Sequence, residues 1–177
     1  MGSKLWFEAK NINCFKVGFK VIKDINFICT PAQHFSGRKG FVETQKSLWA
    51  SWVVKSGKRS FYFSGDSGYS KHYKEIGKKY GPLELVFMDS GQYNTRWRSV
   101  HNMPDEVIKG FIDVKGENLI PIHWGMFTLA MHNWFDPPVE IEKRAKEQNI
   151  SLITPIIGQV IDMENLIVSE SWWEKLI

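Results

Sequence analysis

From residue 60 onward, short apolar runs alternate with longer helix-like segments, and this order decides the fold class. The apolar runs, which are typical of strands, are Ser60–Ser64, Leu83–Met88, Leu119–Ile122 and Ser151–Thr154. The segments between them, which begin and end with helix signals, are Tyr69–Tyr80, Pro104–Val114 and Pro137–Gln148. Strands that alternate with helices build a mostly parallel sheet, so the sequence predicts a mixed α/β fold.

The first part of the chain carries strand patterns without helices between them. Alternating apolar residues over Val17–Val21 and the apolar run Ile25–Thr30 predict two strands. A third, Leu48–Val54, is predicted to pair with Ser60–Ser64 in a hairpin that turns at Ser56-Gly57-Lys58. A length of 177 residues and the lack of any linker predict one domain over residues 1–177.

Composition excludes several classes of protein. Hydrophobic residues make up 43% of the chain, which excludes a disordered tail, and two cysteines exclude a disulfide scaffold. No apolar run approaches the roughly 20 residues of a membrane helix, and no signal-peptide core is present. The expected location is therefore the cytoplasm, with peripheral contact to a membrane left open.

Charge is distributed unevenly along the sequence. Residues 1–100 carry 17 Lys or Arg against 7 Asp or Glu, a balance of +10, whereas residues 101–177 carry 6 against 12. A basic half can attract phosphate-bearing partners, and eight tryptophans offer stacking surfaces, so a nucleic-acid binder is an alternative function. The chain has no recognised nucleic-acid-binding motif, and nucleic acid is not the expected partner.

Three metal-ligating residue types follow three predicted strands. His34 follows Ile25–Thr30, Asp66 follows Ser60–Ser64, and His123 follows Leu119–Ile122. Binding sites of open α/β sheets collect at the carboxyl ends of strands. Histidine and aspartate are the usual nitrogen and oxygen ligands of zinc and related divalent metals. The residues alone leave two interpretations open, a metal site and a set of hydrogen-bonded structural side chains.

Several motifs in a fixed order carry a family resemblance. They are TPAQHFSGR, LWASWVV, FYFSGDSGY, EIGKKYGPLEL, GQYNTRW, VHNMPDEV, PIHWGMFTLA and FDPP. In this order they resemble the metallo-β-lactamase superfamily, and within it the branch of N-acylphosphatidylethanolamine phospholipase D. The resemblance covers about Ile25 to Gly158.

The resemblance implies a fold, a cofactor and a reaction. The fold is a four-layer αββα sandwich, the cofactor is a pair of zinc ions, and the reaction is hydrolysis of a phosphodiester in a lipid-like substrate. Matched residue by residue, it implies that His34, Asp66 and His123 are metal ligands, with Asp66 shared between the metals. It also implies a catalytic role for Asp66 and for His101, which lies beside the substrate. Tyr93, Arg96 and Trp97 fall on a loop that lines the same cleft.

One departure from the family pattern limits what the resemblance implies. The superfamily signature H-x-H-x-D-H is absent, because no two of the five histidines are separated by a single residue. The chain is thus expected to form a partial domain in which the N-terminal half of the sandwich is missing, with zinc bound partially or not at all. Three explanations are open: a truncated form, one half of a two-chain enzyme that pairs with a complementary N-terminal half, and a non-catalytic binding module.

Two further features concern structure more than chemistry. His72 lies between Lys71 and Lys74 in a predicted helix, which indicates a surface position. Trp172-Trp173 near the C-terminus is expected to pin the end of the chain onto the body of the protein.

Overall fold

The structure is a computed structural model that describes residues 19–22, 24–35, 38–39, 42–43, 49–166 and 170–177. Val17 and Leu48, where two strands are predicted to begin, lie outside the described residues. A seven-stranded sheet has the order β1-β2-β5-β6-β7-β8-β9. Its strands are β1 (Phe19–Ile22), β2 (Ile25–Pro31), β5 (Ala50–Ser56), β6 (Arg59–Phe63), β7 (Leu83–Asp89), β8 (Gly116–Ile122) and β9 (Ser151–Leu152). A separate hairpin pairs β3 (Arg38–Lys39) with β4 (Val42–Glu43).

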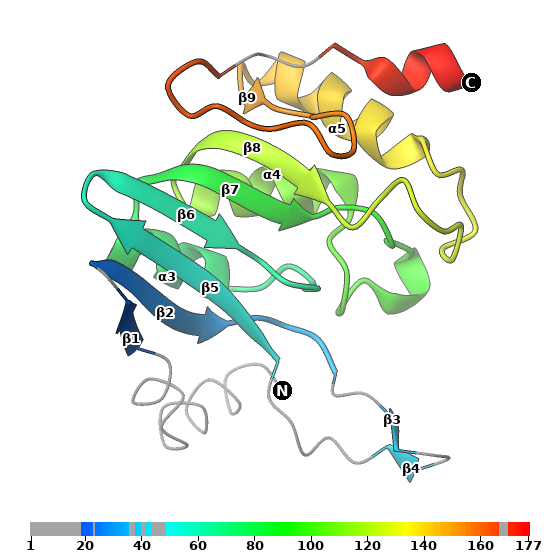
Figure 1. Cartoon of the computed structure of the whole chain (residues 1–177). Coiled ribbons are helices and arrows are strands. Elements are labelled where there is room, and N and C mark those ends of the chain that lie inside the picture. The colour runs from blue at the N-terminus through cyan, green and yellow to red at the C-terminus, as the bar shows by residue number, and fades with distance from the viewer. Residues whose placement is uncertain (1–18, 23, 36–37, 40–41, 44–48, 167–169) are drawn as a thin grey trace.

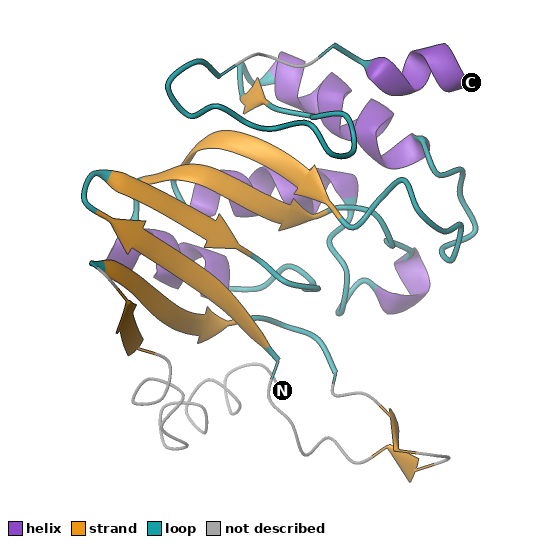
Figure 2. Ribbon diagram, in the orientation of Figure 1, coloured by secondary structure: helices purple, strands orange, loops and turns teal. Residues whose placement is uncertain are grey.

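In the described part of the chain, three α-helices connect the parallel strands, and two short 3-10 helices lie in a loop and at the C-terminus. The α-helices are α3 (His72–Tyr80), α4 (Pro104–Asp113) and α5 (Asp136–Glu147), and the 3-10 helices are η1 (Thr95–Trp97) and η2 (Trp172–Leu176). Figure 2 shows α3 and α4 on one face of the sheet. The mixed α/β class expected from the sequence is confirmed. None of the described helices is long and apolar enough to cross a lipid bilayer.

Strand direction explains why one edge of the sheet collects functional residues. β2 is antiparallel to β5 and β5 is antiparallel to β6, so β2 and β6 run the same way. β7 and β8 then continue parallel to β6. The carboxyl ends of β2, β6, β7 and β8 therefore lie at the same edge, where their arrowheads point in Figure 1.

The main core lies between the sheet and the helices. Alternate residues of neighbouring strands, Val53, Tyr62, Val86 and Leu119, are completely buried. They pack against apolar residues of the helices, including Tyr73, Ile76, Ile108 and Phe111. Each fully buried side chain of this size stabilises the fold by roughly 1.5–3 kcal/mol, which makes this layer the principal source of stability.

The opposite face of the sheet is covered only in part by described residues. Leu85 and Ile120 are buried there beneath the segment that follows β9, through contacts with Ile161 and Met163. Ion pairs from Arg59 to Glu84 and Glu164 tie that segment to the sheet.

Farther along this face, two aromatic side chains lie at the surface. Trp52 and Phe63 are cross-strand partners of β5 and β6, and they are 38% and 46% exposed. We name this pair the aromatic face. Apolar area of this kind is available for contact with another chain or segment.

Candidate metal centre

Five side chains meet at the shared edge of the sheet, and we name them the histidine–aspartate cluster. They are His34 after β2, Asp66 after β6, Asp89 at the end of β7, His101 before α4, and His123 after β8. The ring centroids of His34 and His101 are 5.2 Å apart, and those of His101 and His123 are 5.3 Å apart. Asp66 Oδ1 lies 3.7 Å from His123 Nδ1. The structure thus brings together residues that are far apart in the sequence.

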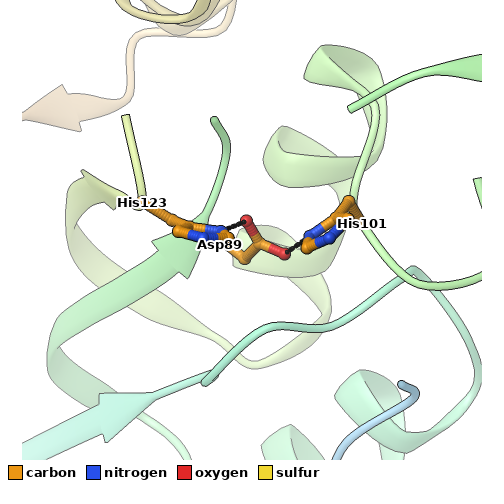
Figure 3. Close-up of side chains that lie close together, drawn as sticks. All are labelled: Asp89, His101 and His123. Carbon is orange, nitrogen blue, oxygen red and sulfur yellow. Dashed lines mark hydrogen bonds and ion pairs between the residues drawn. The ribbon is translucent and has the colours of Figure 1, made fainter. Parts of the chain in front are cut away.

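Asp89 accepts hydrogen bonds from two of the histidines in the cluster. Its side chain is completely buried, and Figure 3 shows it between the two rings. His101 Nδ1 donates to Asp89 Oδ2 over 2.7 Å, and His123 Nδ1 donates to Asp89 Oδ1 over 3.0 Å. The backbone N–H of Ser67 adds a third hydrogen bond to Oδ2, over 3.0 Å. Because three donors converge on it, the carboxylate is fixed in position and hydrogen-bonded through both oxygens.

These contacts set the protonation of the cluster. Burial would raise the pKa of Asp89, but the hydrogen bonds from His101 and His123 outweigh burial and lower that pKa below its ordinary value. The hydrogen bond to Asp89 raises the pKa of His123 against the opposing effect of partial burial. Asp89 is therefore ionised at neutral pH and fixes the Nδ1–H tautomer of both rings.

Fixing the Nδ1–H tautomer leaves the other ring nitrogen of each histidine available. Among the described residues, no hydrogen bond reaches Nε2 of His101 or His123. His34 has the same arrangement, because its Nδ1 donates to the carbonyl of Phe35 over 3.0 Å. Its Nε2 is buried and lacks a hydrogen-bond partner among the described residues. A histidine held through one nitrogen by a carboxylate or carbonyl, with the other nitrogen free, is the usual arrangement of a metal ligand.

The backbone around His123 is tightly constrained. His123 has φ of 69°, in the left-handed region that non-glycine residues seldom adopt. A Cβ at Gly91 would lie 1.7 Å from the His123 carbonyl oxygen, so only glycine allows the two segments to approach this closely. Ser90 adds two hydrogen bonds to the Ile122 carbonyl, from its N–H over 3.1 Å and from its hydroxyl over 2.9 Å. The loop after β7 therefore positions the turn that carries His123.

A fourth histidine, His72, supports the cluster from within the core. His72 is only 4% exposed, and burial lowers its pKa from 6.5 to about 3. Its ring contacts the hydroxyls of Ser70 at 2.7 Å and Ser67 at 3.4 Å. The surface position expected for His72 is wrong, because the first turn of α3 faces the sheet and brings His72 and Tyr73 into the interior. Through Ser67, which also contacts Asp89, the neutral ring is linked to the cluster.

Three residues that the family resemblance places on a loop near the substrate lie between Asp89 and His101 in the sequence. They are Tyr93, Arg96 and Trp97, and each has a different environment. The ring of Tyr93 stacks on His132 with centroids 4.3 Å apart, and burial raises the pKa of Tyr93 to about 12. Trp97 donates from Nε1 to the carbonyl of Gln92 over 2.7 Å. Arg96 is exposed.

Asp89 was not predicted from the sequence. The same criterion that selects His34, Asp66 and His123, a polar residue at the end of an apolar strand, also applies to Asp89 in VFMDS. It is outside the family motifs that carry the resemblance, and a single aspartate at a strand end is a weak signal on its own.

The donor set fits a divalent cation. One donor atom from each of Asp89, His101 and His123 lies within 4.8 Å of the others. Because the Asp89 oxygens accept the Nδ1–H groups of both rings, the Nε2 atoms of the histidines are the donors available to an ion. The buried Nε2 of His34, which has no hydrogen-bond partner in the part of the chain that the structure describes, is an acceptor of the kind that a metal ion satisfies. Imidazole and carboxylate together suit zinc and neighbouring transition metals.

Comparison with known proteins defines the family to which this chain belongs. A family model for the beta-lactamase superfamily domain matches residues 8–124, and the chain belongs to this family. The structure is similar to that of Igni18, a metallo hydrolase from the archaeon Ignicoccus hospitalis, with a TM-score of 0.58 and 16% identity. That similarity covers 77% of this chain and 52% of the other, so this chain forms only part of the metallo-β-lactamase fold.

Sequence relatives support the phospholipase D-like branch. The chain is 34% identical to N-acyl-phosphatidylethanolamine-hydrolyzing phospholipase D 1 of Caenorhabditis elegans over 78% of its own length. It is 35% identical to an uncharacterized protein of Mycobacterium tuberculosis over 86% of its length. In both cases it spans 41% of the relative. The superfamily and branch expected from the sequence motifs are confirmed.

Proposed function

We propose that this chain carries one part of the active site of a metal-dependent hydrolase that cleaves phosphodiesters of lipid-like substrates. The observation behind the proposal is the convergence of three histidines and two aspartates at one sheet edge, where the buried Nε2 atom of His34 has no hydrogen-bond partner among the residues that are described. Membership of a superfamily with metallo hydrolases supports the reaction class. Similarity to proteins named as phospholipases D supports a phosphodiester as the substrate.

The residues of the cluster divide into ligands and supports. His34, Asp66 and His123 would hold the metal, which in the proposal is zinc, with Asp66 as the shared carboxylate. Such an ion supplies Lewis-acid activation of water and of a phosphoryl oxygen when bound. Asp89 orients His101 and His123 through their Nδ1 atoms and keeps their Nε2 atoms directed away from itself. His101 Nε2, which carries no proton in the Nδ1–H tautomer, would accept a proton from the attacking water and pass it to the leaving oxygen of the substrate.

The surroundings of the cluster suit an amphiphilic substrate. The exposed guanidinium of Arg96 can pair with a phosphate. Tyr93 and Trp97 bring aromatic surface to the same loop. The loop after His123 exposes large apolar side chains, at 81% for Met126, 64% for Phe127 and 69% for Leu129. In the proposal these apolar side chains meet acyl chains at the surface of a membrane, as a peripheral contact.

A complementary segment completes the proposed site. Three ligands shared between two metals are too few, because a stable zinc site takes about four protein ligands or three with water. The H-x-H-x-D-H signature is absent from this sequence, and the chain spans 41% of its relatives. We infer that a segment with that signature packs against the aromatic face of Trp52 and Phe63, either within a longer protein or as a second chain.

Reconstitution tests the proposal directly. The 177-residue chain is mixed with the N-terminal portion of the C. elegans relative, zinc is added, and hydrolysis of N-acylphosphatidylethanolamine in mixed micelles is followed by mass spectrometry. We expect hydrolysis by the mixture and not by either part alone. Asp66→Ala should abolish it, whereas Lys71→Ala, at the exposed N-cap position of α3, should not change it. A mixture that associates and retains two zinc ions but cleaves neither this lipid nor bis(p-nitrophenyl) phosphate would refute the enzymatic function.

A further inference from the structure

Four tryptophans form one stacked group at the end of the sheet that bears His123. We name Trp124, Trp134, Trp172 and Trp173 the tryptophan cluster. Trp172 lies between two of the others, with its centroid 5.5 Å from Trp124 and 6.3 Å from Trp134 in near-parallel stacks. Trp173 meets Trp124 edge-on, at 5.7 Å and 90°. Aromatic pairs with these separations attract beyond the area that they bury.

The C-terminal helix η2 is anchored where it carries two of these rings. Trp173 is completely buried, which confirms that the Trp172-Trp173 pair pins the end of the chain onto the protein. Trp172 Nε1 donates to the carbonyl of Thr154 over 3.1 Å. Ser171 donates to Glu142 Oε1 of α5 over 2.6 Å. Figure 1 shows η2 alongside α5, at the C-terminus. These hydrogen bonds hold the C-terminal segment, with both rings, through residues outside the loop that carries Trp124.

Trp124 is the link between this group and the metal centre, because it directly follows His123 in the chain. Its Nε1 donates back to the carbonyl of Pro121 over 2.9 Å, which closes the turn around His123. The loop after β7 supports one side of this turn, through Gly91 and Ser90. The rings of Trp172 and Trp173 support the other side, through Trp124.

We propose that Trp172 is a positioning residue for His123: by stacking on Trp124, the C-terminal helix keeps His123 in its left-handed conformation and its ring beside Asp89. The expected effect on metal binding rests on the proposed function, in which His123 is a metal ligand. This role of Trp172 adds a distant segment, η2, to the parts of the chain on which metal binding depends. A backbone conformation that is rare for histidine persists only where its surroundings hold it.

Zinc affinity is the first test. Trp172→Leu keeps an apolar side chain but removes the ring, and Trp172→Phe restores a ring. Trp52→Leu, on the aromatic face, is the control for loss of an indole elsewhere. Zinc binding to the 177-residue chain is measured by competition with a chromophoric chelator, and cobalt spectra report the ligand geometry. We expect Trp172→Leu to weaken zinc binding about tenfold, the equivalent of one aromatic pair, and Trp172→Phe to recover most of it. Equal affinity in Trp172→Leu and Trp52→Leu would overturn the inference.

Amide hydrogen exchange provides a second test that needs no metal. The Ser90 N–H bonds to the Ile122 carbonyl, next to His123, and reports whether that turn is closed. We expect Ser90 to exchange at least several-fold faster in Trp172→Leu than in Trp52→Leu, with far-UV circular dichroism unchanged. Should Trp172→Leu lose its folded spectrum, Trp134→Leu removes the outer ring of the same stack and should show a smaller effect in the same direction.

The two tests separate the inference from the proposed function. A wild-type chain that binds no zinc, either alone or mixed with the N-terminal portion of the C. elegans relative, would contradict the metal site, yet faster exchange at Ser90 would still support the role of Trp172. Unchanged exchange in both Trp172→Leu and Trp134→Leu would overturn that role, whatever the chain does with zinc.

Discussion

Burial of His72 makes the stability of this protein depend on pH in a predictable window. In the folded state the pKa of His72 is lowered to about 3, whereas in the unfolded chain it returns to about 6.5. A folded pKa below the unfolded one means that the unfolded state binds the proton first as pH falls. The stabilising effect of the neutral, buried ring is therefore complete above pH 6.5 and is lost progressively between pH 6.5 and pH 3.

The size of the effect follows from the same two values. Each pH unit below 6.5 costs about 1.4 kcal/mol, so lowering the pH from 7.5 to 5.0 should remove about 2 kcal/mol of unfolding free energy through His72 alone. His72 is 4% exposed, so solvent screens little of this. The pH stays above the range in which most carboxylates take up protons, which keeps their contribution small.

Urea unfolding of wild type and His72→Gln at both pH values tests this. The glutamine is neutral throughout and can bond to the hydroxyls of Ser67 and Ser70. Between pH 7.5 and pH 5.0, we expect the free energy of unfolding of the wild type to fall by about 2 kcal/mol more than that of His72→Gln. Lys74→Gln, on the exposed side of α3, should keep the wild-type dependence. Equal losses in wild type and His72→Gln would refute the reasoning, because they would show that His72 is not buried in its neutral form.

Three further outcomes are expected. Asp89→Asn should weaken zinc binding about 10- to 100-fold, measured by chelator competition, because the amide no longer fixes the tautomer of both histidines; unchanged affinity would exclude the orienting role. Gly91→Ala should lower the thermal midpoint more than Gly57→Ala, since its Cβ would collide with the backbone, whereas at Gly57 only the left-handed φ costs about 1–2 kcal/mol. The double change Trp52→Ser and Phe63→Ser should reduce self-association in analytical ultracentrifugation, and equal sedimentation would show that the aromatic face makes no contacts in solution.

The sequence predicted most of the fold because local signals and tertiary packing agree there. The hairpin around Gly57 is present, with β5 and β6 on either side of it. The helix predicted to begin at Pro104 begins there, with Pro at its first position and Glu106 bonded back to the N–H of Met103. Helix α3 begins at His72, three residues later than predicted, because Tyr69 lies outside the helix and donates its hydroxyl to Asp113.

The cluster could be predicted only in part. The positions of His34, Asp66 and His123 follow from strand ends, and strand direction explains why those ends meet. Asp89 could not be distinguished from an ordinary turn residue, because its importance arises from complete burial between two rings. His72 was misinterpreted for the converse reason, since its lysine neighbours at positions 71 and 74 point outward while its own position on the helix points inward.

The placement of the cluster on four strand ends has a consequence for the kinetics of folding. His34 and His123 lie at the two ends of a long stretch of chain, and they approach only after β2, β5, β6, β7 and β8 have paired. No contiguous stretch of the described residues contains the whole cluster, so an ion at this site would find its ligands only once this high-contact-order sheet is in place. Interactions that form after the transition state slow unfolding and leave the folding rate almost unchanged. Zinc bound at this edge is therefore expected to lengthen the lifetime of the folded protein without helping it to fold.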